Sequence, residues 1–277
     1  MTYGWSAKDT SARLYRSAII ASIMMIVFYV YIYWFEPFPP LWNQFFSNFF
    51  LQLASLCAAV VATLIWSRYE KTDTPRRVWG PFAISLWLWF GGELSWGYLN
   101  MTVGDVQVGL PDVFWVSSYF TFALALLNQY RILQQPDQRA MTKAVLFISA
   151  AVGAITLLIY SVFILAADSP SRLEVAVNSF YPAGDLLLAI TALWLVRHFA
   201  GGAFARPWVG LLIFTFSDLM YAWLEATGTY AWSVDHGNLL STVSDIAYLM
   251  AYLVLFVGVL YQWLFLKYGM LSPSGKQ

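Results

Sequence analysis

The sequence predicts an all-α polytopic membrane protein with eight transmembrane helices. Of its 277 residues, 60% are hydrophobic and only 11% are charged, which is typical of an integral membrane chain. A helix needs about 20 apolar residues to cross the ~30 Å hydrocarbon core of a bilayer. Apolar runs of about that length occur at 17–35, 46–67, 79–100, 112–132, 143–166, 175–197, 207–227 and 241–266.

The distribution of lysine and arginine gives the orientation, because these residues stay on the cytoplasmic side of a membrane. If the eight runs alternate in direction, every basic residue except Arg172 falls on the same side as the N-terminus. We therefore expect both termini to be cytoplasmic, in the inner (cytoplasmic) membrane of the cell. The expected parts are a cytoplasmic tail at 1–16, membrane segments at 17–133 and 143–266, and a second cytoplasmic tail at 267–277.

The first three runs differ in their polar content. The run at 17–35 ends in tyrosine, tryptophan and phenylalanine, which favour a membrane interface. The segment EPFPPLWNQF follows it, and its prolines predict a rigid loop without helix. The run at 46–67 carries Asn48 and Gln52 at helical spacing, as residues that hydrogen-bond a neighbouring helix do. The run at 79–100 contains Gly91 and Gly92 beside Glu93, and glycines permit close helix approach.

The later runs differ in their acidic residues and in one proline. The run at 112–132 opens with Asp112, whereas the run at 143–166 has no ionisable residue after its first position. Pro182 predicts a kink in the run at 175–197, close to Asp185. The last two runs each contain an acid, Asp218 and Asp245, within an otherwise apolar sequence.

Matching spacings predict an internal repeat of four helices. Pro81 lies 12 residues before Glu93, and Pro207 lies 11 residues before Asp218. In the helix that follows each of these, Asp112 precedes Tyr119 by 7 residues and Asp245 precedes Tyr252 by 7. Four crossings return the chain to its starting side, so the two halves would be parallel repeats about an axis along the membrane normal.

The acids within the predicted spans are the candidate functional residues. Asp185 and Asp218 lie near the middle of the membrane, Glu93 lies somewhat outward of it, and Asp112, Asp245 and Glu225 lie at the outer mouth. A charge at a helix centre costs on the order of 2.5–3.5 kcal/mol on insertion scales. The spans hold no basic partner except at their cytoplasmic ends. The acids must therefore be protonated, share protons, bind a cation, or accept hydrogen bonds.

Hydroxyl donors recur at helical spacing from these acids. Residues at i, i+3, i+4 and i+7 share a helix face, and the tyrosines in such positions are Tyr119, Tyr181, Tyr221 and Tyr252. We interpret the acids and these tyrosines as one polar pocket that opens outward and binds a ligand. The alternative interpretation is structural: polar contacts that fix helix register, with Asp112 and Asp245 capping helix N-termini.

Several chemistries are excluded by the residues present. No lysine lies deep in a span, so a retinal Schiff base has no attachment point. His198 and His236 fall in loops on opposite sides, which excludes a bis-histidine haem. A formal net charge of zero gives no support for nucleic-acid binding. The sequence leaves the identity of any cofactor or metal open.

Three segments carry a family resemblance: PDVFWVSSYFTFALALL, SFYPAGDLLLAI, and FSDLMYAW followed by SDIAYLMAYLVL. Over residues 105–266 the chain resembles the polytopic membrane sensory module found N-terminal to diguanylate cyclase, phosphodiesterase and histidine kinase domains. The resemblance implies a shared scaffold with an outward-facing ligand site. Because the sequence ends soon after its last apolar run, we expect it to act without an output domain of its own.

The expected function is therefore that of a non-enzymatic membrane protein, a sensor-like or accessory subunit. Its partners would be the lipid bilayer and either another membrane protein or a second copy of this chain. One alternative is a lipid-acting hydrolase that uses Glu93 and Asp218 as general acid and base. The segment SDLMYAW also resembles part of the eight-helix membrane lysoplasmalogenases, which keeps this alternative open. A second alternative is a proton or cation carrier.

Overall fold

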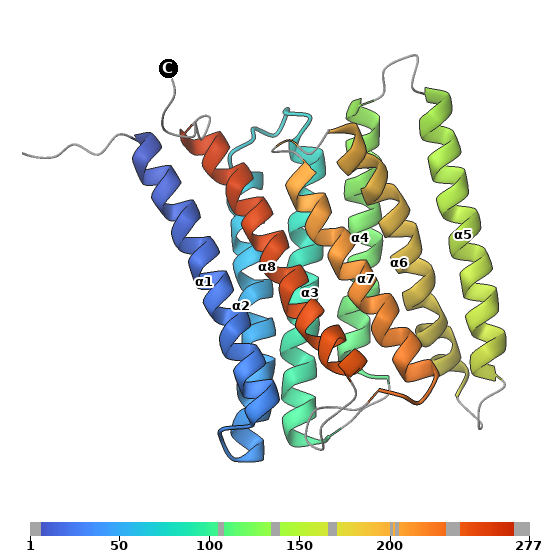
Figure 1. Cartoon of the computed structure of the whole chain (residues 1–277). Coiled ribbons are helices and arrows are strands. Elements are labelled where there is room, and N and C mark those ends of the chain that lie inside the picture. Colours follow the sequence, from blue (N-terminus) through green and yellow to red (C-terminus); the bar gives the residue numbers. More distant parts are fainter. Residues whose placement is uncertain are drawn as a thin grey trace, which may run out of the picture.

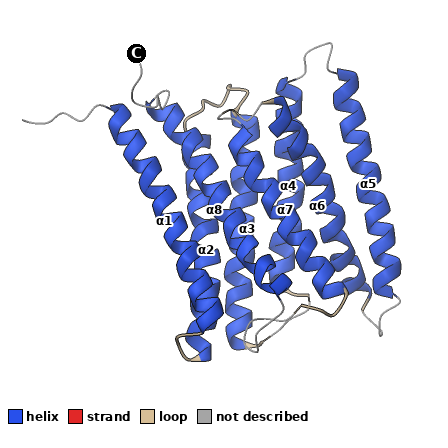
Figure 2. Ribbon diagram, viewed as in Figure 1, coloured by secondary structure: helices blue, strands red, loops and turns tan. Residues whose placement is uncertain are grey.

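The computed structural model describes residues 7–104, 108–133, 139–165, 171–199, 202, 205–230 and 239–268. Within these ranges the chain forms helices joined by loops and contains no strand (Figure 2). The eight helices are α1 (Ala7–Phe35), α2 (Pro40–Trp66), α3 (Arg76–Thr102), α4 (Leu110–Leu133), α5 (Arg139–Leu165), α6 (Arg172–His198), α7 (Arg206–Ala226) and α8 (Leu239–Tyr268). Each of the eight predicted runs thus forms one helix.

Seven of the eight helices are long and apolar enough to cross a membrane, which is the pattern of a multi-pass membrane protein. The remaining helix, α3, has 27 residues, but its central stretch is less apolar than those of the other seven. Two arginines open it, and glycine, serine and Glu93 lie along it. Because α3 packs between α2 and α4, much of its polar content faces other helices.

Two helix starts differ from the sequence-based expectation. The helix α1 begins at Ala7, although its apolar run begins at residue 17, so residues 7–16 of the expected tail are helical. The helix α2 begins at Pro40, so most of the proline-rich segment after Glu36 was wrongly predicted as loop. Proline fits the first turn of a helix, where no intrahelical partner exists for a backbone N–H. Residues 1–6 and 269–277 of the two expected tails lie outside the described residues.

Six helices form a closed ring through their contacts. Going round the ring, α2 contacts α3, α3 contacts α4, α4 contacts α6, α6 contacts α7, α7 contacts α8, and α8 contacts α2. The two other helices lie outside: α1 packs on α8 and α2, and α5 packs on α6. Figure 1 shows α1 and α5 at opposite edges of the bundle.

The helices run alternately up and down, so α1 begins and α8 ends at the same end of the bundle (Figure 1). We name this the proximal end and the opposite end, where α1 stops and α8 starts, the distal end. Five buried aromatic side chains, named here the aromatic plug, lie from the middle of the ring toward its proximal end: Phe82, Trp89, Phe122, Trp208 and Phe214.

Close approach of α7 and α8 depends on two glycines. A Cβ atom on Gly210 would lie 2.5 Å from the Cα atom of Leu255, and one on Gly258 would lie 2.9 Å from the backbone of Arg206. Both distances are shorter than any side chain tolerates against backbone. These two helices therefore touch backbone to backbone, as small residues allow in lipid.

Candidate functional site

The two mid-helix aspartates share one tyrosine. The hydroxyl of Tyr119, on α4, lies 2.5 Å from Oδ1 of Asp185, on α6. The same hydroxyl lies 3.0 Å from Oδ2 of Asp218, on α7. Tyr119 and Asp185 are buried, and Asp218 is half-buried. Three helices of the ring thus converge on a single phenol oxygen.

The third inner acid has a partner of its own. The hydroxyl of Tyr252, on α8, donates to Oε1 of Glu93, on α3, at 2.7 Å. Gln52 of α2 donates to the backbone carbonyl of Glu93 at 3.2 Å, so the amide predicted to bind a neighbouring helix does so.

The two outer acids lie at the distal end, and tyrosines contact both of them. Tyr181 of α6 donates to Oδ1 of Asp112 at 2.7 Å, and the backbone N–H of Gly109 donates to Oδ2 at 2.7 Å. In the second bond Asp112, in the first turn of α4, caps the N–H of the residue before the helix, as the structural interpretation expects. The same expectation is wrong for Asp245, because α8 begins at Leu239 and Asp245 is the seventh residue of the helix. Asp245 accepts from Tyr33 of α1 at 2.7 Å and from Tyr230 at 3.1 Å.

Two of the tyrosines at helical spacing from an acid bond acids of other helices. Tyr119 follows Asp112 on α4 but bonds Asp185 and Asp218, whereas Tyr181 precedes Asp185 on α6 but bonds Asp112. The reason is geometric: a tyrosine extends away from its helix axis, so its hydroxyl reaches the next helix. Tyr221, expected beside Asp218, packs its ring edge-on against Tyr230 at 4.9 Å between centroids.

Two partners of Asp245 were missed. The sequence places Tyr33 among aromatic residues at a membrane interface, and no sequence pattern points to Tyr230. One signal pointed to Tyr33, because Tyr29 and Tyr33 lie four residues apart and so share a helix face. Both are buried in the structure.

The Tyr119 hydroxyl and the two carboxyl groups around it have fewer hydrogen-bond donors than acceptors. A phenol carries one hydrogen, so it donates to one carboxylate at a time. The second short contact therefore requires a proton on one carboxyl group, or a cation between the carboxylates. In addition, Oδ2 of Asp185 is buried and has no hydrogen-bond partner among the described residues. An unpaired carboxylate oxygen in a dry site is costly, so one more proton or positive charge would stabilise this junction.

The acid–tyrosine network, defined as the five acids with Tyr119, Tyr181, Tyr252, Tyr33 and Tyr230, stops at the aromatic plug. Trp89 and Phe214 lie directly on its proximal side, with the Phe214 ring 5.1 Å from that of Tyr252. Phe122 packs on Trp89 at 4.6 Å, and Phe82 packs on Phe122 and Trp208 at 5.4 Å each. The network therefore reaches from the distal end only to the middle of the ring.

A metal centre is not apparent in the described part of the chain, where no three histidine, cysteine, aspartate or glutamate side chains are grouped to hold an ion. His236 lies outside the described residues. Comparison with known proteins gives no relative: no family model, curated protein or solved structure matches the chain.

Proposed function

We propose that this chain is a non-enzymatic, sensor-like or accessory membrane protein whose acid–tyrosine network binds a small organic cation from the distal side. The observation that carries the proposal is the Tyr119 junction. There two carboxyl groups compete for one phenol hydrogen and a third oxygen, Oδ2 of Asp185, is unpaired. A bound ammonium group would donate to these oxygens and neutralise their charge.

Aromatic side chains around the acids favour an organic cation over a bare metal ion. The rings of Tyr119 and Tyr181 lie 6.0 Å apart, and those of Trp96 and Trp115 lie 6.2 Å apart. The face of an aromatic ring attracts an ammonium group. The described acids also lack the grouping that a metal ion needs.

The aromatic plug favours binding over transport. A carrier needs a route from its site to each side of the membrane, whereas here the acid–tyrosine network occupies only the distal half. The positive-inside pattern supports eight crossings with the proximal end in the cytoplasm, so the site would sample the outside of the inner membrane. In this arrangement the ligand arrives from outside, as in a sensor, and the signal passes to a partner protein.

The test is thermal unfolding of the purified full-length chain in mild detergent. Methylammonium, tetramethylammonium and choline, at constant ionic strength and pH, are compared with sodium and potassium. A cation at 100 times its Kd should stabilise by about 2.7 kcal/mol, which is a shift of several degrees in Tm. Asp218→Asn and Glu93→Gln remove charge with little change of shape, so these variants should fold and lose the shift. Glu70→Gln, at an exposed position in the loop between α2 and α3, is the matched control and should keep it.

Other outcomes decide between the alternatives. A wild type that responds to no cation and no pH change, with variants indistinguishable from it, would leave the acids a structural role alone. Turnover of a lipid by the purified chain, lost in both variants, would indicate the hydrolase. Cation or proton flux in sealed liposomes would indicate the carrier.

A further inference from the structure

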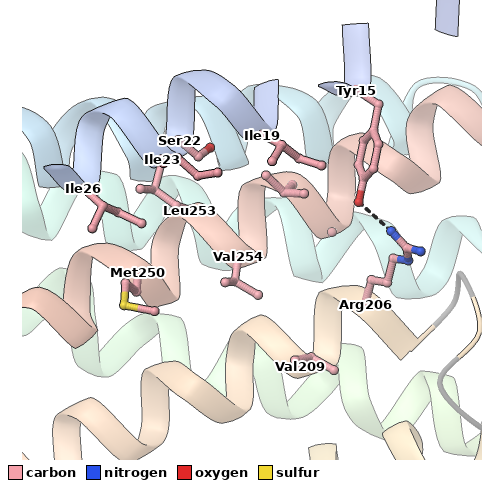
Figure 3. A pocket seen from close by; sticks show the side chains of 12 residues that line it. Tyr15, Ile19, Ser22, Ile23, Ile26, Arg206, Val209, Met250, Leu253 and Val254 are labelled. Carbon is pink, nitrogen blue, oxygen red and sulfur yellow. Dashed lines mark hydrogen bonds between the residues drawn. The ribbon is translucent and has the colours of Figure 1, made fainter. Parts of the chain in front are cut away.

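A second candidate site lies outside the acid–tyrosine network, on the membrane-facing side of the bundle. A groove of about 340 Å³ runs between α1, α7 and α8 in the proximal half (Figure 3). Its volume falls within the range of about 300–1,000 Å³ that is usual for small-molecule sites. The walls are aliphatic, with Ile19, Ile23 and Ile26 on α1 facing Leu253 and Val254 on α8.

The proximal end of the groove carries a positive charge. Arg206, the first residue of α7, donates through Nη1 to the hydroxyl of Tyr15 on α1 at 2.5 Å. Its guanidinium carbon lies 3.8 Å from the ring centroid of Tyr261 on α8. Two rings therefore hold the guanidinium in place, and no carboxylate among the described residues pairs with it. A guanidinium has five N–H donors, and Tyr15 takes only one.

One polar side chain lies along the apolar part of the groove. Ser22 is 7% exposed, and its Oγ has no hydrogen-bond partner among the described residues. It lines the groove from α1, seven residues beyond Tyr15. Seven residues of helix are about 10 Å, so the groove presents a cation at its mouth and a hydroxyl donor about 10 Å deeper.

We infer that this groove binds an anionic glycerophospholipid of the proximal leaflet. The lipid phosphate contacts Arg206 and Tyr15, an ester oxygen accepts from Ser22, and one acyl chain lies along the aliphatic wall. Charge complementarity selects this occupant: a neutral apolar chain alone would leave the Arg206 charge and the Ser22 hydroxyl unpaired. The position agrees as well, because a residue at the start of a membrane helix lies at headgroup level.

The inference is independent of the proposed cation site, because none of the groove residues belongs to the acid–tyrosine network. A bound lipid would also affect how α1 is held, since α1 lies outside the ring and contacts only α8 and α2 extensively. A lipid in this position would join α1 to α7 through Arg206. Lipid composition would then control how firmly α1 is held.

The experiment measures lipid bound to the full-length chain in nanodiscs that contain equal amounts of phosphatidylglycerol and phosphatidylcholine with the same acyl chains. After mild detergent extraction, the two lipids retained per protein are counted by native mass spectrometry. We expect retained phosphatidylglycerol to exceed phosphatidylcholine. Arg206→Gln should reduce the excess about tenfold, which is the usual loss for one charge-assisted hydrogen bond. Arg197→Gln, at an exposed position of the same end, should leave it unchanged.

A second variant separates loss of folding from loss of binding. Val254→Trp fills the groove and keeps Arg206, so it should lower retention of both lipids while the thermal transition persists. Equal retention of the two lipids by the wild type, or an unchanged excess in Arg206→Gln, would overturn the inference. So would displacement of the retained lipid by inorganic phosphate, because the site would then take a free anion. None of these results depends on whether the distal network binds a cation.

Discussion

Trp89 of α3 and Phe214 of α7 stack face to face across the centre of the ring, with their centroids 3.8 Å apart and their planes at 25°. Each ring lies four residues before the acid of its own helix, Glu93 or Asp218. The acids then accept from tyrosines in matching positions: Tyr252 of α8 bonds Glu93, and Tyr119 of α4 bonds Asp218. An internal repeat of α1–α4 and α5–α8 would produce this reciprocal arrangement.

Tyr119 and Tyr252 should contribute unequally to stability, because the Tyr119 hydroxyl contacts two acids and the Tyr252 hydroxyl contacts one. We expect Tyr252→Phe to cost about 1–3 kcal/mol, the usual penalty for leaving a buried acceptor unpaired, and Tyr119→Phe to cost more. Thermal unfolding in detergent measures both. Tyr31→Phe, on an exposed face of α1, is the control and should change little. Losses no larger than that of the control would mean that neither hydroxyl stabilises the fold.

Gly210 should be intolerant of even a methyl group. Alanine normally stabilises a helix by about 1 kcal/mol relative to glycine. In Gly210→Ala the new Cβ would meet the Cα of Leu255 at 2.5 Å, so α7 and α8 must separate and Tm should fall. Leu94→Ala, at a residue 51% exposed, is the comparison. A Tm at or above that of the wild type would show that α7 and α8 do not touch at this point.

Gly92 has a different contact, with a side chain. A Cβ there would lie 2.2 Å from Nε1 of Trp115 on α4. We expect Gly92→Leu to lower thermal stability in detergent well beyond Leu94→Ala, because the indole is wedged between α3 and α4. If the two variants have equal, small effects, this face of α3 points to lipid.

Cysteine labelling tests the proposed orientation. The only native cysteine, Cys57, is first replaced by alanine. In intact cells, Thr72→Cys in the loop between α2 and α3 should resist an impermeant thiol reagent. Thr229→Cys, beyond α7, should react, and both should react after the membrane is permeabilised. Labelling at position 72 in intact cells would reverse the orientation.

Asp112 should act both as a helix cap and as a tyrosine partner. Asp112→Ala removes the acceptors of Gly109 and Tyr181, and we expect a loss of about 1–2 kcal/mol. Asp112→Asn keeps one carbonyl acceptor and should lose about half as much. A double-mutant cycle with Tyr181→Phe isolates the tyrosine bond. A coupling of zero would assign the whole effect to the cap.

The helices were predictable from sequence because each needs only a local signal. A run of about 20 apolar residues favours a helix whatever surrounds it, and each of the eight runs forms one, although α1 and α2 begin before their runs. Of the acid–tyrosine network, the acids were predictable but most of their tyrosine partners were not. Glu93, Asp185 and Asp218 were identified because acids in apolar helices are conspicuous.

Their partners were not predictable, because helix periodicity describes one helix at a time. The bond from Tyr119 to Asp218 spans 99 residues and depends on how α4 and α7 are placed round the ring. The start of α2 was predicted wrongly for another reason. Proline usually predicts the end of a helix, but Pro40 lies in the first turn of α2, where a missing backbone N–H breaks no intrahelical hydrogen bond.

The aromatic plug also decides where a membrane voltage acts. If a cation reaches the acids through water at the distal end, as the proposed function requires, the electric field would concentrate across the aromatic plug, because its side chains have low permittivity. One elementary charge crossing 100 mV gains about 2.3 kcal/mol, but a cation that stops at Asp218 crosses only the polar half and gains little of this. Occupancy of the site would therefore follow the concentration in the distal compartment and remain nearly constant as the cell polarises or depolarises.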